Sequence, residues 1–248
     1  MKELGRIQKR SLNVVITGGN RGLGRALAME HLRLGDNVTV VGRRAPCIGH
    51  ISFVHCDVSD PLELQRVIRE EVRGPVDMWI NNAASSDQSV PFAQQSVESV
   101  NKMVMTNVVA PMVVLKTLGD LEYDSVSIFN MSGAGSDGRA TSLFCVYGAT
   151  KAGITQFTKS MSVGAGEGRR SVVHLVSPGL MSTDLLLTNL DPSVKAALDM
   201  FTSDPQVVAK HIVPMMRRAH YNGKPSHIIF QTPLKIVVKI IMKLLRII

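Results

Sequence analysis

A tyrosine and a lysine four residues apart are the residues of this sequence best suited to acid–base chemistry. Tyr147 and Lys151 stand in the stretch YGATK, and residues at this spacing share one face of a helix. A free phenol has a pKa of about 10, and a nearby ammonium favours the phenolate and lowers that pKa. A tyrosine tuned in this way could exchange a proton with a carbonyl oxygen. Because many solvated helix faces carry the same spacing, the case depends on the rest of the chain.

A glycine-rich turn near the start of the chain predicts a dinucleotide site. The apolar run 12–17 leads into TGGNRGLG, with glycines at 18, 22 and 24, and a helical pattern over 23–34 and a β-branched run over 38–41 follow. Strand, glycine turn, helix and strand in this order are the context that such a site requires. The N–H groups and partial positive charge at the helix start would hold the pyrophosphate. The alternative is an ordinary glycine-rich turn without a ligand.

The end of the second strand favours NADPH over NADH. An NAD site places an acidic residue there to bind the ribose hydroxyls, but this strand ends with Gly42, Arg43 and Arg44, and Arg21 lies in the glycine turn. Guanidinium groups suit a 2′-phosphate, although two solvated arginines would look the same. Asp57, after the third strand, could bond the adenine amino group or merely cap the helix that begins at Asp60-Pro61.

Asn107 lies in a long helical stretch, four residues before Pro111. Because proline has no N–H, the Asn107 carbonyl loses its helical partner and the helix should kink there. A free carbonyl in a cleft can hold a water molecule. A packing kink with a solvated amide is the competing interpretation.

The pattern of elements predicts one α/β domain with a Rossmann-type, doubly wound, seven-stranded parallel sheet and helices on both faces. The aromatic content is only 4% of 248 residues, so the core is aliphatic, as in buried parallel strands. We expect strands over 12–17, 38–41, 51–56, 76–80, 125–131, 172–176 and 226–230, and helices over 23–34, 60–72, 96–118, 146–163, 184–201 and 205–218. The domain should span residues 1–232.

Charge and cysteine content exclude several classes of protein. The net charge of +8 admits an anionic cofactor or membrane, but no basic run is interleaved with aromatics, so we expect no nucleic-acid partner. Cys47, Cys56 and Cys145 are isolated, without zinc-ligand spacing. We therefore expect no metal site and a reducing compartment.

Taken together, these motifs resemble the short-chain dehydrogenase/reductase family over residues 11–232. The resemblance rests on TGGNRGLG at 17–24, NNAA at 81–84, Asn107, YGATK at 147–151 and Pro178-Gly179 with Thr183. It implies that Tyr147 is the general acid, that Lys151 lowers the pKa of Tyr147 and holds the ribose, and that Asn107 holds a relay water. It also implies a homo-oligomer. The implied cofactor contacts are Gly18, Asn20, Arg21, Gly22, Leu23, Gly24, Arg43, Asp57, Asn82, Lys151, Pro178, Gly179 and Thr183.

The serine that polarises the carbonyl in this family is ambiguous in the sequence. The family's serine stands about thirteen residues before the tyrosine, and here that position is Ala134. Ser132 aligns through Ser-Gly-Ala-Gly with a slightly longer loop, and this alignment favours it, whereas Ser136 lies eleven residues before Tyr147. Both are candidate catalytic residues.

One branch of the family, the chlorophyll b reductases, is the most similar. The segments that carry this resemblance are FNMSGAGS at 129–136, VYGATK at 146–151, SPGLMSTDLLL at 177–187, IVP at 212–214 and FQTP at 230–233. The branch reduces the 7-formyl group of chlorophyll b to hydroxymethyl. In it an acidic residue commonly replaces Ser132 and Ser136 is kept, which favours Ser136. The resemblance implies a chlorophyll-type substrate or another lipophilic carbonyl compound; a non-catalytic NADPH-binding sensor is the alternative from a different class.

The last fifteen residues predict a basic amphipathic helix. In 234–248, four cations recur at intervals of four, four and three residues on an otherwise apolar segment: Lys235, Lys239, Lys243 and Arg246. Such a helix lies in a membrane interface more readily than it spans one, although it could instead dock on a partner subunit. The expected location is the cytoplasm or the stromal side of a chloroplast, peripheral to a thylakoid-type membrane.

Overall fold

Seven parallel strands form one sheet in the order β3-β2-β1-β4-β5-β6-β7. The structure, a computed structural model, describes residues 10–87, 90–121, 123, 125–141, 144–163, 171–181 and 202–231. The strands are β1 (Asn13–Thr17), β2 (Asn37–Gly42), β3 (Ser52–His55), β4 (Met78–Asn81), β5 (Val126–Met131), β6 (Ser171–Ser177) and β7 (His227–Ile229). The predicted seven-stranded parallel sheet is thus confirmed, and each strand lies within two residues of its predicted bounds.

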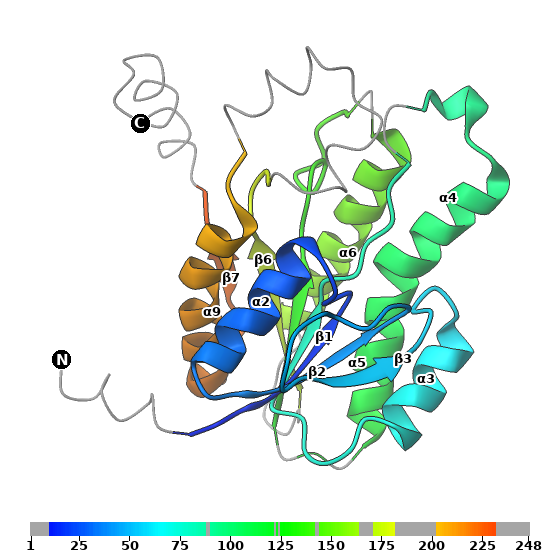
Figure 1. Cartoon of the computed structure of the whole chain (residues 1–248). Coiled ribbons are helices and arrows are strands. Elements are labelled where there is room, and N and C mark those ends of the chain that lie inside the picture. The colour runs from blue at the N-terminus through cyan, green and yellow to red at the C-terminus, as the bar shows by residue number, and fades with distance from the viewer. Residues whose placement is uncertain are drawn as a thin grey trace, which may run out of the picture.

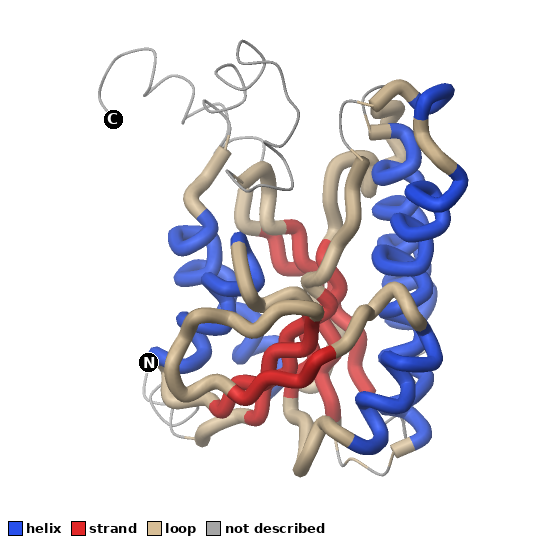
Figure 2. The backbone as a smooth tube through the Cα atoms, turned by 45° about the vertical axis from the view of Figure 1, so that its right-hand side comes forward, coloured by secondary structure: helices blue, strands red, loops and turns tan. Residues whose placement is uncertain are grey.

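Helices cover both faces of the sheet. Helices α2 (Gly22–Arg33) and α9 (Pro205–Asn222) lie on one face, where Ile16, Leu27 and Ile212 share a hydrophobic cluster. The other face carries α3 (Pro61–Glu70), α4 (Val97–Val104), α5 (Ala110–Asp120) and α6 (Cys145–Val163). Figures 1 and 2 show the sheet between these two layers. Every residue of β4 and β5 is buried, as expected for strands covered on both sides.

The order of the strands places a crevice at one edge of the sheet. The chain moves outward from β1 to β2 and β3, and then returns to continue on the other side with β4. Ligands of such sheets bind outside the carboxyl ends of the strands, at this switch point between β1 and β4. The glycine turn after β1 and the polar segment after β4 therefore meet where a cofactor would lie.

The long helix over Val97–Asp120 is not regular. Its middle, Met105–Val109, is a π-helical turn in which the Ala110 N–H donates to the Met105 carbonyl. Pro111 follows directly, so the irregularity occurs at the predicted kink. This stretch is long and apolar enough to suit a membrane span, but Asn107 is buried within it, and a buried core helix passes the same test.

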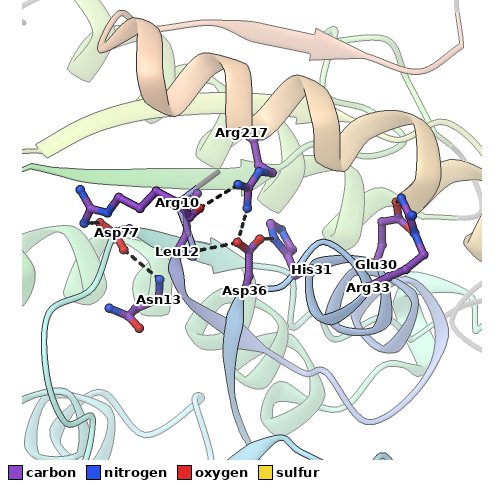
Figure 3. Close-up of polar contacts among 9 residues, drawn as sticks. All are labelled: Arg10, Leu12, Asn13, Glu30, His31, Arg33, Asp36, Asp77 and Arg217. Carbon is purple, nitrogen blue, oxygen red and sulfur yellow. Dashed lines mark hydrogen bonds and ion pairs between the residues drawn. The ribbon is translucent and has the colours of Figure 1, made fainter. Parts of the chain in front are cut away.

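A buried ionic cluster lies at the other edge of the sheet, where the strands begin (Figure 3). Asp36 accepts hydrogen bonds from the Leu12 N–H at 3.0 Å and from Arg217 of α9, and its other oxygen lies 2.7 Å from His31 Nδ1. Arg217 also donates to the Arg10 carbonyl at 3.1 Å. The cluster joins α9 to the start of β1.

Candidate active site

Helix α6 carries Tyr147 and Lys151 at the carboxyl end of β5. The Lys151 Nζ donates to the Met131 carbonyl at 3.0 Å and lies 5.6 Å from the centre of the Tyr147 ring. Lys151 is only 4% exposed. The last residue of β5 therefore fixes the lysine, and the lysine lies beside the tyrosine.

Loss of contact with water dominates the proton affinities of this pair, although Tyr147 as a whole residue is half-buried and only Lys151 is fully buried. This loss raises the pKa of Tyr147 to about 12 and lowers the pKa of Lys151 to about 8. The sequence predicts the opposite direction for the tyrosine; the difference arises because removal of water from the phenol outweighs a charge lying 5.6 Å from its ring. At neutral pH the phenol thus carries its proton and the lysine is mostly charged, which suits Tyr147 to giving a proton.

Gly133 lies close beside the tyrosine hydroxyl. A Cβ at this position would lie 2.6 Å from Tyr147 Oη and 3.1 Å from Lys151 Cγ. Gly135 packs against α6 in the same way, since its Cβ would lie 2.6 Å from Gly148 Cα. The turn 133–136 therefore packs closely on α6. Gly133 is absent from the predicted site residues, because no local sequence pattern indicates this contact.

The two candidate serines lie in different surroundings. The Ser132 hydroxyl is 2.7 Å from the hydroxyl of Ser177 on β6. The Ser136 hydroxyl accepts from the Gly133 N–H at 2.8 Å and donates to the Lys151 carbonyl at 3.4 Å. Neither hydroxyl is hydrogen-bonded to Tyr147 among the described contacts. Ser136 belongs to the turn that touches the tyrosine, and its donated bond is long, so its hydrogen can be redirected at little cost.

Asn107 uses its side chain to tie α6 to the segment after β4. Its Oδ1 accepts from the Ser85 N–H at 2.8 Å, and its Nδ2 donates to the Ser85 carbonyl at 2.8 Å and to Thr150 Oγ1 at 3.0 Å. The Thr150 hydroxyl donates in turn to the Tyr147 carbonyl at 2.7 Å. The competing interpretation of a solvated amide at Asn107 is therefore wrong, because this amide is buried and hydrogen-bonded. The sequence signal for its role is Thr150, a hydroxyl three residues after Tyr147.

The glycine turn leaves the start of α2 open to an anion. Gly18 and Gly22 have φ of +69° and +54°, and a Cβ on Gly24 would lie 2.3 Å from the Gly18 carbonyl oxygen. Arg21, the N-cap residue, makes no side-chain cap, and the first turn has no acidic residue. The free N–H groups and the helix dipole at the start of α2 therefore suit a phosphate group.

Two predicted cofactor contacts support the turn or the core with their side chains. The Asn82 amide donates to the Thr17 and Gly18 carbonyls at 3.0 and 3.2 Å, which holds the turn against the end of β4. The Leu23 side chain is buried in the core, so only its backbone can face a ligand. Asn20 is half-buried in the turn and Arg21 is exposed.

The end of β2 presents cations, with a carboxylate nearby. Arg43 and Arg44 are exposed, and Arg43 Nη1 lies 3.8 Å from Asp57 Oδ2. Asp57 Oδ1 accepts from the Ser59 N–H and hydroxyl at 3.0 and 2.7 Å. Asp60, and not Asp57, caps α3.

The last predicted contacts follow β6. Pro178 is buried, and Gly179 has φ of +80° at the end of the strand. Thr183, the predicted helix 184–201 and the predicted tail helix 234–248 lie outside the described residues.

Comparisons with known proteins give the family and the fold. The family model described as short chain dehydrogenase matches residues 12–192. The chain is 33% identical to chlorophyll(ide) b reductase NOL of Arabidopsis thaliana, over 92% of this chain and 72% of the relative. It is 32% identical to probable chlorophyll(ide) b reductase NYC1 of Oryza sativa, over 92% of this chain but only 51% of the relative, so it spans about half of that protein.

Solved structures share the architecture at low sequence identity. A gluconate 5-dehydrogenase from Burkholderia cenocepacia, in complex with NADP and tartrate, matches with a TM-score of 0.77 at 16% identity, covering 92% of this chain and 97% of that one. A short chain dehydrogenase family protein from Francisella tularensis matches with a TM-score of 0.75 at 20% identity, covering 89% and 97%. These likenesses concern the fold alone.

Proposed function

The chain belongs to the short chain dehydrogenase family, and we propose that it is an NADPH-dependent reductase that converts the formyl group of chlorophyll b to a hydroxymethyl group. Family membership makes it an oxidoreductase. The observation that carries the proposal is Tyr147, a protonated phenol that lies beside Lys151 and the backbone of Gly133 and can therefore give a proton to a carbonyl oxygen.

The residues of the crevice fit a dinucleotide. When bound, NADPH supplies the hydride. The uncapped start of α2 and the glycines at 18, 22 and 24 would hold its pyrophosphate. Arg21 and Arg43 would bind the 2′-phosphate: the Arg43–Asp57 pair is long and partly exposed, so it contributes little stability and a phosphate could displace the carboxylate.

The acid–base residues account for the proton in this reaction. The carbonyl carbon gains a hydride and its oxygen takes the proton of Tyr147, so aldehyde, NADPH and one proton give alcohol and NADP⁺. Lys151 would hold the ribose hydroxyls and return a proton toward the phenolate, with Asn107 holding a water through its main chain. Thr150 and the Asn107 side chain keep the Tyr147 backbone in place.

Ser136 is the better candidate for polarising the carbonyl. It lies in the turn that packs beside the Tyr147 hydroxyl. Its Oγ is 3.4 Å from the Lys151 carbonyl oxygen, so the hydrogen bond that it donates there is long. Ser132 makes a shorter bond to Ser177 across the sheet, which suits a residue that pins two strands. We therefore assign the carbonyl contact to Ser136 and a structural role to Ser132.

The substrate assignment rests on the relatives. The two relatives are named chlorophyll(ide) b reductase and probable chlorophyll(ide) b reductase, and both names include the word chloroplastic. Chlorophyll b is a lipophilic aldehyde. A basic amphipathic tail at 234–248 would bring a homo-oligomeric enzyme to the stromal surface of a thylakoid membrane, where such a pigment resides.

Incubation of the purified chain with chlorophyll b and NADPH tests this function. Pigment chromatography should show the hydroxymethyl product, and NADH in place of NADPH should give much less of it. Reduction of other lipophilic carbonyl compounds without any hydroxymethyl pigment would contradict the substrate. Binding of NADPH without turnover of any carbonyl compound would contradict the enzyme and support a sensor.

A further inference from the structure

Gln231 lies just beyond the edge strand β7, next to the segment that follows β6. Pairing of the two strands continues past β7, because the Phe230 N–H donates to the Ser177 carbonyl at 3.0 Å. The Gln231 amide then packs on Gly179, since a Cβ built on this glycine would lie 2.4 Å from Gln231 Oε1 and 3.0 Å from its Cδ. With φ of +80°, only glycine suits this position.

The other end of the amide binds a second segment. Gln231 Nε2 donates to the Ser203 hydroxyl at 2.8 Å. The Ser203 N–H donates to the Leu180 carbonyl at 2.9 Å, and Met181 forms a parallel bridge with Ser203. One side chain thus joins two stretches of backbone, 179–181 and 202–203.

We propose that Gln231 is a positioning residue for the nicotinamide end of the cofactor. This inference rests on the proposed function and on the resemblance, which implies cofactor contacts at Pro178, Gly179 and Thr183. The first two follow β6, the strand paired with β5, and the end of β5 holds Lys151 beside Tyr147. By filling the space over Gly179 and holding Ser203 against Leu180, the amide fixes the backbone of residues 179–181, directly after β6. A small shift of that backbone would displace the hydride donor relative to Tyr147, and hydride transfer is sensitive to such displacement.

The location of Gln231 separates this role from general stability. The residue is only half-buried and comes after the last ladder residue of the edge strand. Its described partners are the segment after β6 and Ser203, so its loss should leave the core and the adenosine end of the crevice intact.

The test compares Gln231→Met, Ser203→Ala and the double variant with the natural chain. Methionine keeps the volume of glutamine but removes the amide. We expect the KM for NADPH to rise about fivefold and kcat to fall in either single variant, as for the loss of one hydrogen bond. The double variant should resemble the singles, because both remove the same bond.

Binding of adenosine 2′,5′-bisphosphate, which lacks the nicotinamide, should not change in any of them. Ser226→Ala is the matched control: this hydroxyl donates to the Lys224 carbonyl at 3.1 Å, and Ser226 lies at the other end of β7, where its carbonyl accepts from the Leu175 N–H at 3.0 Å. Its kinetic constants should equal those of the natural chain.

The outcomes separate this inference from the proposed function. If the natural chain binds NADPH but reduces no carbonyl compound, the proposed function fails, and NADPH binding by Gln231→Met still decides the inference. Unchanged NADPH affinity and turnover in Gln231→Met overturn it, as does an equal loss of affinity for NADPH and for adenosine 2′,5′-bisphosphate. A natural chain that binds no NADPH overturns both.

Discussion

Asp36 and Lys151 are both buried charged residues, but they lie at opposite edges of the sheet and are held differently. Asp36, where the strands begin, has a side chain with no exposed surface and is bonded by the Leu12 N–H, His31 and Arg217 (Figure 3). Lys151, where the strands end, donates its described hydrogen bond to a single carbonyl, that of Met131.

The pKa directions show what this difference means. Burial would raise the pKa of Asp36, but the hydrogen bonds from His31, Arg217 and Leu12 outweigh it and hold that pKa below its usual value. Burial instead lowers the pKa of Lys151 to about 8. The native fold stabilises the charge of Asp36 and opposes that of Lys151. The charged group where the strands begin, Asp36, therefore stabilises the fold. The charged group where they end, Lys151, is kept for its proposed chemical role although its burial costs stability.

The strongest test of this contrast removes the phenol from the functional edge. Tyr147→Phe should lower kcat/KM for chlorophyll b reduction by about 10²–10⁴-fold, the usual contribution of a general acid, while NADPH binding and the free energy of unfolding stay nearly unchanged. Steady-state kinetics and denaturant unfolding measure the two effects. Tyr123→Phe, at a half-buried tyrosine after α5, is the matched control and should keep full activity. A Tyr147→Phe enzyme that retains most of its activity would refute the role of the phenol.

The corresponding change at the stability edge is Arg217→Met. It leaves Asp36 buried without its guanidinium partner, and breaking such a pair costs about 3–5 kcal/mol of unfolding free energy. Arg66→Met, which breaks exposed pairs with Glu70 and Glu71, should cost far less, because solvent screens such pairs. Urea unfolding monitored by Trp79 fluorescence would compare them. Equal losses in the two variants would show that the cluster around Asp36 contributes no special stability.

Local sequence patterns predicted the strands and many residues of the candidate site at the carboxyl ends of the strands. They did not predict the ionic cluster around Asp36 at the amino ends. The strands and the kink at Asn107 follow from apolar runs and from a proline, which act within a few residues. The Asp36–Arg217 pair joins residues 181 positions apart, and no local periodicity encodes it. The same limit applies within the candidate site: Gly133, Ser85 and Gln231 acquire their neighbours only when the strands pair. The sequence could name Ser132 and Ser136, but only the structure distinguishes their hydrogen-bond partners.

A third variant tests whether Lys151 really opposes stability. Lys151→Met removes a charge whose pKa is lowered from 10.5 to about 8 by burial. The variant should therefore be more stable than the natural chain by about 1–3 kcal/mol at pH 7. Lys116→Met, at an exposed lysine paired with Asp120, should change stability by no more than about 0.5 kcal/mol.

The pH dependence of this gain follows from proton counting. Between pH values of about 8 and 10.5, native Lys151 has lost its proton while the unfolded chain keeps it. The unfolded state then binds more protons, so the natural chain gains stability as the pH rises. The advantage of Lys151→Met should shrink over this range. A constant advantage would mean that it arises from packing rather than from the buried charge.

The smallest expected effect is the pH profile of the reaction itself. As the pH rises through about 8, Lys151 loses the charge that would hold the ribose hydroxyls and return a proton to Tyr147, so kcat/KM should fall by about tenfold between pH 7 and pH 9. Ionisation of Tyr147 does not contribute, because its pKa is about 12. Lys151→Arg keeps a positive charge over the whole range, and although its overall activity should be lower, its profile should be flat to pH 9. A natural enzyme with an equally flat profile would show that the Lys151 charge is not required at the rate-limiting step, and the cost of burying it would then need another reason.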